Sequence, residues 1–164
     1  MLIEKYKLPN GVRVVVEHIP HVRSVAIGIW VKTGSRFETA QMNGMSHFIE
    51  HMVFKGTEKR SARHIAEAFD EIGGHVNAFT SKEYTCFYAK VLDEHTPVAL
   101  DVLEDMFFNS TFDDGEMRKE KQVVIEEIRI GCTICRLKLQ SQTIHSGIRF
   151  SVRSRMWAAL NQTI

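Results

Sequence analysis

NGMSHFIEHMVFKGT, residues 43–57, is an apolar segment that carries two histidines and a glutamate, and it guides the interpretation of the whole 164-residue chain. His47 and His51 are four positions apart, so on an α-helix both imidazoles project from one face. Two such rings can bind one metal ion at about 2.0–2.1 Å. Glu50 precedes the second histidine and lies one turn from the first, where it can take a proton from a metal-bound water. The segment predicts a zinc site on a helix.

A chance grouping of surface histidines with a glutamate is the alternative, and the flanking residues argue against it. The large apolar side chains of the segment are Phe48, Ile49, Met52, Val53 and Phe54. They predict a largely buried helix, in which polar groups without partners would be costly. A metal ion removes that cost. Catalytic zinc also needs a third protein ligand and a free position for water, so another His, Asp, Glu or Cys must come from elsewhere.

Three strands are predicted before this helix. Residues 2–18 predict a β-hairpin whose turn is the Pro-Asn-Gly sequence at 9–11. Residues 24–33 alternate between apolar and small or polar side chains, which predicts a third strand. Residues 34–41 are polar and predict a loop that leads into the helix.

The helix of the opening segment and a second helix follow. Asn43 can cap a helix that runs to about Lys55, and Gly56 can end it. Ser61 can cap the second helix, which ends at the glycine pair 73–74. Its apolar stripe consists of Ala62, Ile65, Ala66, Phe69 and Ile72.

The remaining elements favour an α+β fold. Residues 75–81 and 83–92 are rich in β-branched and aromatic side chains and predict two strands. Residues 97–109 predict an amphipathic helix, and a further helix begins at Asp113. Strands followed by helices, with antiparallel neighbours, predict an antiparallel-rich sheet with helices packed on one face, and not a doubly wound parallel sheet.

The order H-x-x-E-H inverts the commoner H-E-x-x-H and is the inverzincin signature. Further motifs accompany it, namely LPNGVRVVVE, TGSRFE, GGHVNAFTSKEYTCFYAKV and EKQVVIEEI. With them the chain resembles the pitrilysin-like zinc peptidases, family M16, from about residue 3 to Arg129. This family includes the mitochondrial processing peptidase β subunit and bacterial processing-protease homologues, and the Bacillus-like members are the most similar. The resemblance implies that residues 1–130 are the N-terminal part of a zinc peptidase domain, a partial pitrilysin-type half-domain.

The resemblance also implies the third zinc ligand. The family carries a glutamate on a later helix in an E-x6-E arrangement, which here matches Glu120 and Glu127. Residues seven apart lie on one helix face, in agreement with this spacing. Glu126 is a rival by position, and the residues alone also allow a solvated charged face. The family spacing selects Glu127 as metal ligand. It makes Glu120 an auxiliary catalytic acid, with a role behind the ligands or on the surface as alternatives.

The implied activity is that of a zinc metalloendopeptidase. Zinc activates water and polarises the scissile carbonyl, while Glu50 acts as general base and passes the proton to the leaving amine. VNAFTS resembles the edge strand of the family, on which an extended substrate lies by β-addition. Asn77, Ala78 and Phe79 would contact the substrate there, and an ordinary core strand is the alternative, above all for Phe79. The expected cofactor is Zn2+, and the expected partner is a peptide or unfolded polypeptide.

Composition excludes little but points away from other partners. The net charge of +1 favours neither nucleic acid nor a charged membrane surface. No window approaches 18 apolar residues, and the N-terminus resembles neither a signal nor a transit peptide. The expected location is the bacterial cytoplasm, with the mitochondrial matrix as alternative. Three cysteines, Cys86, Cys132 and Cys135, give no disulfide framework. Full-length members of the family are often dimeric.

Residues 131–164 depart from the family pattern. They contain no acidic residue, and their apolar residues follow no clear period. The Cys-x-x-Cys at 132–135 suggests a zinc knuckle or a redox motif, but a shifted codon frame explains it better. In that frame the codons of 132–135 permit Val-His-Asp-Leu, and those of 148–155 permit Tyr-Pro-Ile-Leu-Gly-Thr-Glu-Pro, both of which match the family. Residues 131–164 are therefore expected to be an out-of-frame, poorly structured tail.

Three functions remain open from the sequence. The first is a zinc metalloendopeptidase. The second is a truncated, catalytically inert zinc-binding fragment, because the part of the family that closes over the substrate is not recognisable in this chain. The third is a non-enzymatic protein similar to the core subunits of respiratory complexes, in which the motif is commonly degraded. The intact His47, Glu50 and His51 weigh against the third.

Overall fold

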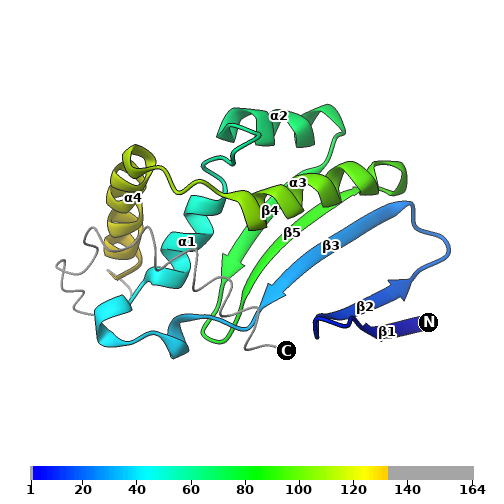
Figure 1. Cartoon of the computed structure of the whole chain (residues 1–164), viewed down its shortest axis with the longest axis horizontal. Helices are drawn as coiled ribbons and strands as arrows, with labels where there is room; N and C mark the ends of the chain where they lie inside the picture. The colour runs from blue at the N-terminus through cyan, green and yellow to red at the C-terminus, as the bar shows by residue number, and fades with distance from the viewer. Residues whose placement is uncertain (1, 133–164) are drawn as a thin grey trace.

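A three-stranded antiparallel sheet lies at the centre of the molecule, with the strand order β3–β5–β4 (Figure 1). The computed structural model describes residues 2–132. β3 is Ser24–Val31, β4 is His75–Thr80 and β5 is Thr85–Leu92. Both outer strands run antiparallel to β5, and Gly28, Tyr88 and Asn77 lie side by side across the sheet. Within the described residues, β4 is therefore an edge strand.

The two faces of this sheet differ, because successive side chains along a strand point to opposite faces. On the face covered by helices, strand and helix residues form the main core, which includes Phe69, Phe87, Ala89, Leu103 and Phe107. On the opposite face Trp30 remains 61% exposed. Its ring packs against Phe79 and Tyr84. One face is thus core, and the other carries an exposed aromatic group.

The helices lie on one side of the sheet and at its β4 edge. In the described part of the chain they are α1 (Met45–Val53), α2 (Ala62–Glu71), α3 (Thr96–Asn109) and α4 (Asp114–Cys132). Short 3-10 turns are η1 (Ser35–Phe37), η2 (Ala40–Met42) and η3 (Asp93–His95). α2 and α3 lie over one sheet face, α1 lies beside β4, and α4 packs against α1 (Figure 1). The predicted α+β class with an antiparallel sheet is confirmed.

The predicted N-terminal hairpin is also present. β1 (Leu2–Lys7) and β2 (Arg13–His18) pair antiparallel in a separate two-stranded sheet. In the turn, Gly11 has a φ of +87°, a left-handed value that glycine adopts without a Cβ clash. The Asn10 side chain accepts a hydrogen bond from the amide of Val12.

The start of α1 differs from the sequence prediction. Asn43 does not cap the helix; the N-cap is Gly44, with a φ of +88° and no side-chain cap of its own. Glu38 supplies the missing acceptors, since its two carboxylate oxygens accept from the amides of Gly44 and Ser46, both at 2.7 Å. The helix also ends at Val53, before the predicted end near Lys55. The sequence prediction failed because local cap preference cannot anticipate an acceptor from a neighbouring loop.

A second core cluster fixes α1 against α4. It consists of the buried residues Phe48, Met52, Phe112 and Val124. Because Phe48 and Met52 are four apart, they form an apolar stripe next to the face that carries the histidines. The polar residues of α1 are therefore brought to the α4 surface.

The remaining sequence predictions concern two helix starts, membrane-spanning segments and the C-terminal tail. Ser61 caps α2, because its hydroxyl accepts from the amide of His64. The helix predicted from Asp113 begins at Asp114. None of the described helices is both long and apolar enough to cross a membrane. The predicted out-of-frame tail lies outside the described residues from position 133 onward.

Candidate metal centre

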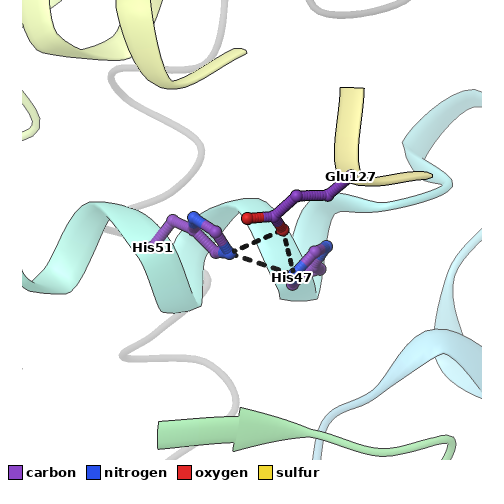
Figure 2. A group of neighbouring side chains, drawn as sticks. All are labelled: His47, His51 and Glu127. Atoms are coloured by element: carbon purple, nitrogen blue, oxygen red, sulfur yellow. Dashed lines mark hydrogen bonds and ion pairs between the residues drawn. The ribbon is translucent and has the colours of Figure 1, made fainter. Parts of the chain in front are cut away.

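The two histidines of α1 meet a glutamate of α4. The Nε2 atoms of His47 and His51 are 3.0 Å apart. Glu127 Oε2 lies 3.6 Å from His47 Nε2 and 3.5 Å from His51 Nε2. Figure 2 shows the carboxylate directed toward both imidazoles. Three atoms with electron pairs for a cation thus converge on one point between two helices.

This triangle has the dimensions of a zinc site. Ligand atoms about 2.0–2.2 Å from a tetrahedral zinc ion are about 3.3–3.6 Å from one another. The two histidine–carboxylate distances fall in that range, and the nitrogen–nitrogen distance is slightly shorter. Without a cation or a shared proton, the three electron-pair donors would repel one another at this range. The residues therefore fit a metal ion in the position that the sequence predicted.

Exposure rises across the group. The His51 side chain is 19% exposed, that of His47 35% and that of Glu127 47%. The His51 side is thus protein-enclosed, and the Glu127 side faces solvent. A catalytic metal site needs one open position for water or substrate, and a group with one solvent-facing side is compatible with this requirement.

Glu120 holds the second ring nitrogen of His51. Its Oε1 lies 2.8 Å from His51 Nδ1, and its Oε2 lies 2.6 Å from Lys55 Nζ. Burial raises the pKa of this carboxyl, but hydrogen bonds from Lys55 and His51 together outweigh burial, and the pKa lies below its ordinary value. An ionised carboxylate can only accept, so Nδ1 is the ring nitrogen that donates to Glu120, and Nε2 is the ring nitrogen that faces His47 and Glu127.

Glu50 has a buried oxygen without a partner. Its Oε2 makes no hydrogen bond within the described part of the chain. A buried carboxylate oxygen in that state is costly. Glu50 lies on the same helix as His47 and His51. This position suits a base that receives a proton from water bound next to the two histidines.

The segment that follows α1 is held by contacts that the sequence prediction missed. After α1, the buried carboxylate of Asp105 accepts from Thr57 Oγ1 and Arg60 Nη1, both at 2.7 Å, and from Asn109 Nδ2 at 3.0 Å. These hydrogen bonds attach the segment after α1, which contains Thr57 and Arg60, to helix α3, which contains Asp105. Lys55 was also missed as a site residue, because it lies beyond the end of α1 and contacts Glu120 on a distant helix.

The other predicted site residues lie in different environments. Glu126, the rival of Glu127, is exposed and does not belong to the converging group. Asn77 is exposed on edge strand β4, Ala78 is buried in the core, and Phe79 is 40% exposed on the open sheet face. β4 borders α1 (Figure 1). Among the residues that the structure describes, the predicted substrate strand is therefore an edge strand next to the histidine helix.

A family model described as Insulinase (Peptidase family M16) matches residues 13–131. The chain belongs to peptidase family M16. This confirms the family that the sequence motifs predicted. The match includes α1, β4 and almost all of α4, so every residue of the converging group lies inside it.

Several relatives of this M16 chain are named as zinc proteases. An uncharacterized zinc protease of Bacillus subtilis, YmxG, is 67% identical over 129 residues, which cover 79% of this chain and 32% of the relative. The uncharacterized zinc protease SCO5738 of Streptomyces coelicolor is 48% identical, with 77% and 28% covered. A probable mitochondrial-processing peptidase subunit beta of Arabidopsis thaliana is 46% identical, with 74% and 23% covered. The chain spans less than a third of the length of these relatives.

The fold has a counterpart among solved structures. The crystal structure of a protease from Helicobacter pylori matches with a TM-score of 0.75 and 28% sequence identity. The match covers 79% of this chain and 31% of that chain. This chain thus shares its arrangement of sheet and helices with part of a larger protease.

Proposed function

We propose that this chain carries the catalytic site of a zinc metalloendopeptidase. The observation that supports the proposal most strongly is the convergence of His47, His51 and Glu127. The helix that carries the two histidines also carries Glu50, whose buried oxygen has no protein partner among the described residues. Family membership and the names of the relatives agree with it.

Each residue of the site has a separate task in this proposal. His47, His51 and Glu127 hold the zinc ion, and Glu120 orients His51. When bound, zinc supplies the Lewis acidity that activates water and polarises the scissile carbonyl. Glu50 takes a proton from the attacking water and delivers it to the leaving amine. This keeps the roles of ligand and base on different side chains.

The substrate in this proposal is an extended peptide or unfolded polypeptide. β4 is an edge strand beside α1, so a peptide that adds to its free edge would pass close to the histidines. Asn77, Ala78 and Phe79 would line that pairing, in which only alternate residues direct their backbone groups to the free edge. Ala78 contributes by its backbone alone, since its side chain is in the core.

The setting in the cell is proposed by analogy with the relatives. The similarity to a Bacillus subtilis protein favours the bacterial cytoplasm, and the similarity to a plant protein named mitochondrial keeps the mitochondrial matrix as the alternative. Association into dimers is a further expectation from the family.

Zinc binding by the 164-residue chain is the direct test. Equilibrium dialysis followed by metal analysis should give about one zinc per chain, and His51→Ala or Glu127→Gln should weaken binding strongly because each removes a ligand. His64→Ala, on the exposed face of α2, and Glu126→Gln are the matched controls and should bind zinc like the wild type.

Two results would contradict the proposal. If the wild-type chain binds no zinc, the proposed metal centre is wrong. Weaker binding by Glu126→Gln, with normal binding by Glu127→Gln, would show that the wrong glutamate is assigned as ligand.

A further inference from the structure

Lys55 occupies an unusual place for a lysine. It lies two residues beyond the end of α1, and its ammonium reaches across to α4 to meet Glu120 Oε2 at 2.6 Å. The Lys55 side chain is 31% exposed, whereas that of Glu120 is 8% exposed. This ion pair is therefore mostly protein-enclosed and differs from the exposed pairs of the molecule, such as Arg23–Asp93.

The carboxylate of Glu120 divides its two oxygens between two partners. Oε2 faces Lys55 Nζ, and Oε1 faces His51 Nδ1 at 2.8 Å. Lys55, Glu120 and His51 thus form a continuous chain of charge-assisted hydrogen bonds that ends at the Nε2 atom directed to the metal centre. Nothing else in the proposed mechanism uses Lys55.

We propose that Lys55 is a positioning residue for the metal centre, which holds the Glu120 carboxylate in the orientation that fixes the ring and tautomer of His51. This inference rests on the proposed zinc site. Lys55 does not touch the reacting atoms; it acts through Glu120.

The physical reason lies in the burial of Glu120. A carboxylate at 6% residue exposure has lost most of its water and needs protein donors for both oxygens. His51 can satisfy one oxygen only. Without Lys55, the carboxylate would rotate toward solvent to find a donor for its second oxygen, and this rotation would leave His51 Nδ1 without its acceptor. Partners behind metal-bound histidines commonly change metal affinity by about 10–100-fold when they are removed.

Lys55 also links the segment directly after α1 to α4, close to the converging group. Glu120 and Glu127 lie seven residues apart on α4, so they face α1 at two successive levels. Glu120 meets the end of α1 through Lys55, and Glu127 meets its middle through the histidines. The ion pair therefore adds a polar contact next to the apolar cluster that packs α1 against α4.

The test compares the zinc affinity of three chains by competition with a chromophoric chelator. The chains are the wild type, Lys55→Met, and Lys59→Met as the matched control, since Lys59 is exposed in the next loop. We expect zinc affinity to fall about 10–100-fold in Lys55→Met and to stay unchanged in Lys59→Met. If Lys55→Met does not fold, Lys55→Ala, which also removes the donor to Glu120, replaces it and is judged by the same criterion.

A double-mutant cycle gives the second measurement. In a Glu120→Gln background, Lys55→Met should cause little further loss of zinc affinity, because Lys55 acts only through that carboxylate. Additive losses would overturn the inference. So would a Lys55→Met chain that binds zinc like the wild type, including one whose metal-free melting temperature falls while its zinc affinity does not. Wild-type chain without zinc binding would instead refute the proposed function.

Discussion

At the scale of single residues, the site depends on which atoms already have partners. His51 directs Nδ1 to Glu120 and leaves Nε2 for the converging group. Glu50, in contrast, keeps one buried oxygen free of protein partners in the described part of the chain. A ligand needs an oriented lone pair, and a base needs an uncommitted one. The hydrogen bonds therefore separate the two roles within a single helix.

Replacement of the base should separate chemistry from metal binding. We predict that Glu50→Gln, made in a full-length homologue that retains this site, keeps its zinc and loses about 10²–10⁴-fold in peptide turnover. The glutamine has the same shape but cannot take up the proton. Metal content and kcat are measured on the same preparation. A loss of zinc stoichiometry in the variant would show that Glu50 is a ligand and not the base.

At the scale of secondary-structure elements, α1 is positioned by contacts at both ends. Glu38 accepts from the first amides of the helix, and Asp105 fixes the segment that follows it. Between these ends, Phe48 and Met52 pack against α4. The helix that carries the histidines is thus held along its whole length, which is needed for a metal site of defined geometry.

Removal of the carboxylate cap should destabilise α1. Because Glu38 satisfies two amides that would otherwise lack acceptors, we predict that Glu38→Ala lowers the free energy of unfolding by about 1 kcal/mol. Urea titration of the metal-free chain measures this change. Glu104→Ala, at an exposed position of α3, is the control and should have little effect. Equal stability of Glu38→Ala and the wild type would argue against the cap.

The buried carboxylate after α1 should make stability depend on acid. Burial raises the pKa of Asp105, but bonds from Thr57, Arg60 and Asn109 together outweigh burial and hold the pKa below its ordinary value of 3.8. A lowered folded-state pKa adds stability above that ordinary value, and this stability is lost as the pH falls through the folded-state pKa. We predict that Asp105→Asn is less stable at about pH 7 and loses less stability between about pH 4 and pH 3.

Urea unfolding at a series of pH values tests this prediction. Asp101→Asn is a suitable control, because Asp101 pairs with the same arginine but its side chain is 61% exposed. That variant should retain the acid dependence of the wild type. If Asp105→Asn instead loses stability in acid as steeply as the wild type, the acid dependence comes from other groups.

At the scale of the whole molecule, the described residues form two core clusters and the complete converging group. The chain nevertheless spans only 32% of its Bacillus subtilis relative. Orientation of a substrate and exclusion of water commonly require enclosure of the site, and small misplacements of a substrate can cost about 10²-fold in rate. We therefore expect this chain to be sufficient for metal binding, whereas efficient turnover needs a longer protein.

We predict that the 164-residue chain hydrolyses peptides about 10²-fold more slowly than a longer protein in which the reading frame that we propose to be shifted after Ile130 is restored and continued. A chain ending at residue 132 is the control and should match the 164-residue chain in zinc affinity and turnover. Equal rates for the 164-residue chain and the frame-restored protein would show that this segment suffices for catalysis. Inactivity of the frame-restored protein would count against the catalytic assignment.

Local patterns in the sequence were sufficient for much of this molecule. The spacing of His47 and His51 predicted a shared helix face, alternation predicted β3, and the hydroxyl of Ser61 predicted a cap that is present. These predictions depend on the geometry of one element, which neighbouring residues largely determine. Family spacing further indicated Glu127, which the structure brings to the histidines.

Only the tertiary structure decided how these elements support the site. Asn43 was a reasonable local cap, yet Glu38 takes that task from a preceding loop. Lys55 meets Glu120 from a distant part of the sequence, a contact that no helical or strand period can indicate. The register of α1 against α4 depends on the packing of buried apolar side chains, and a shift of one turn would separate Glu127 from the imidazoles. The sequence determined which groups were present and on which faces, and packing determined which of them met.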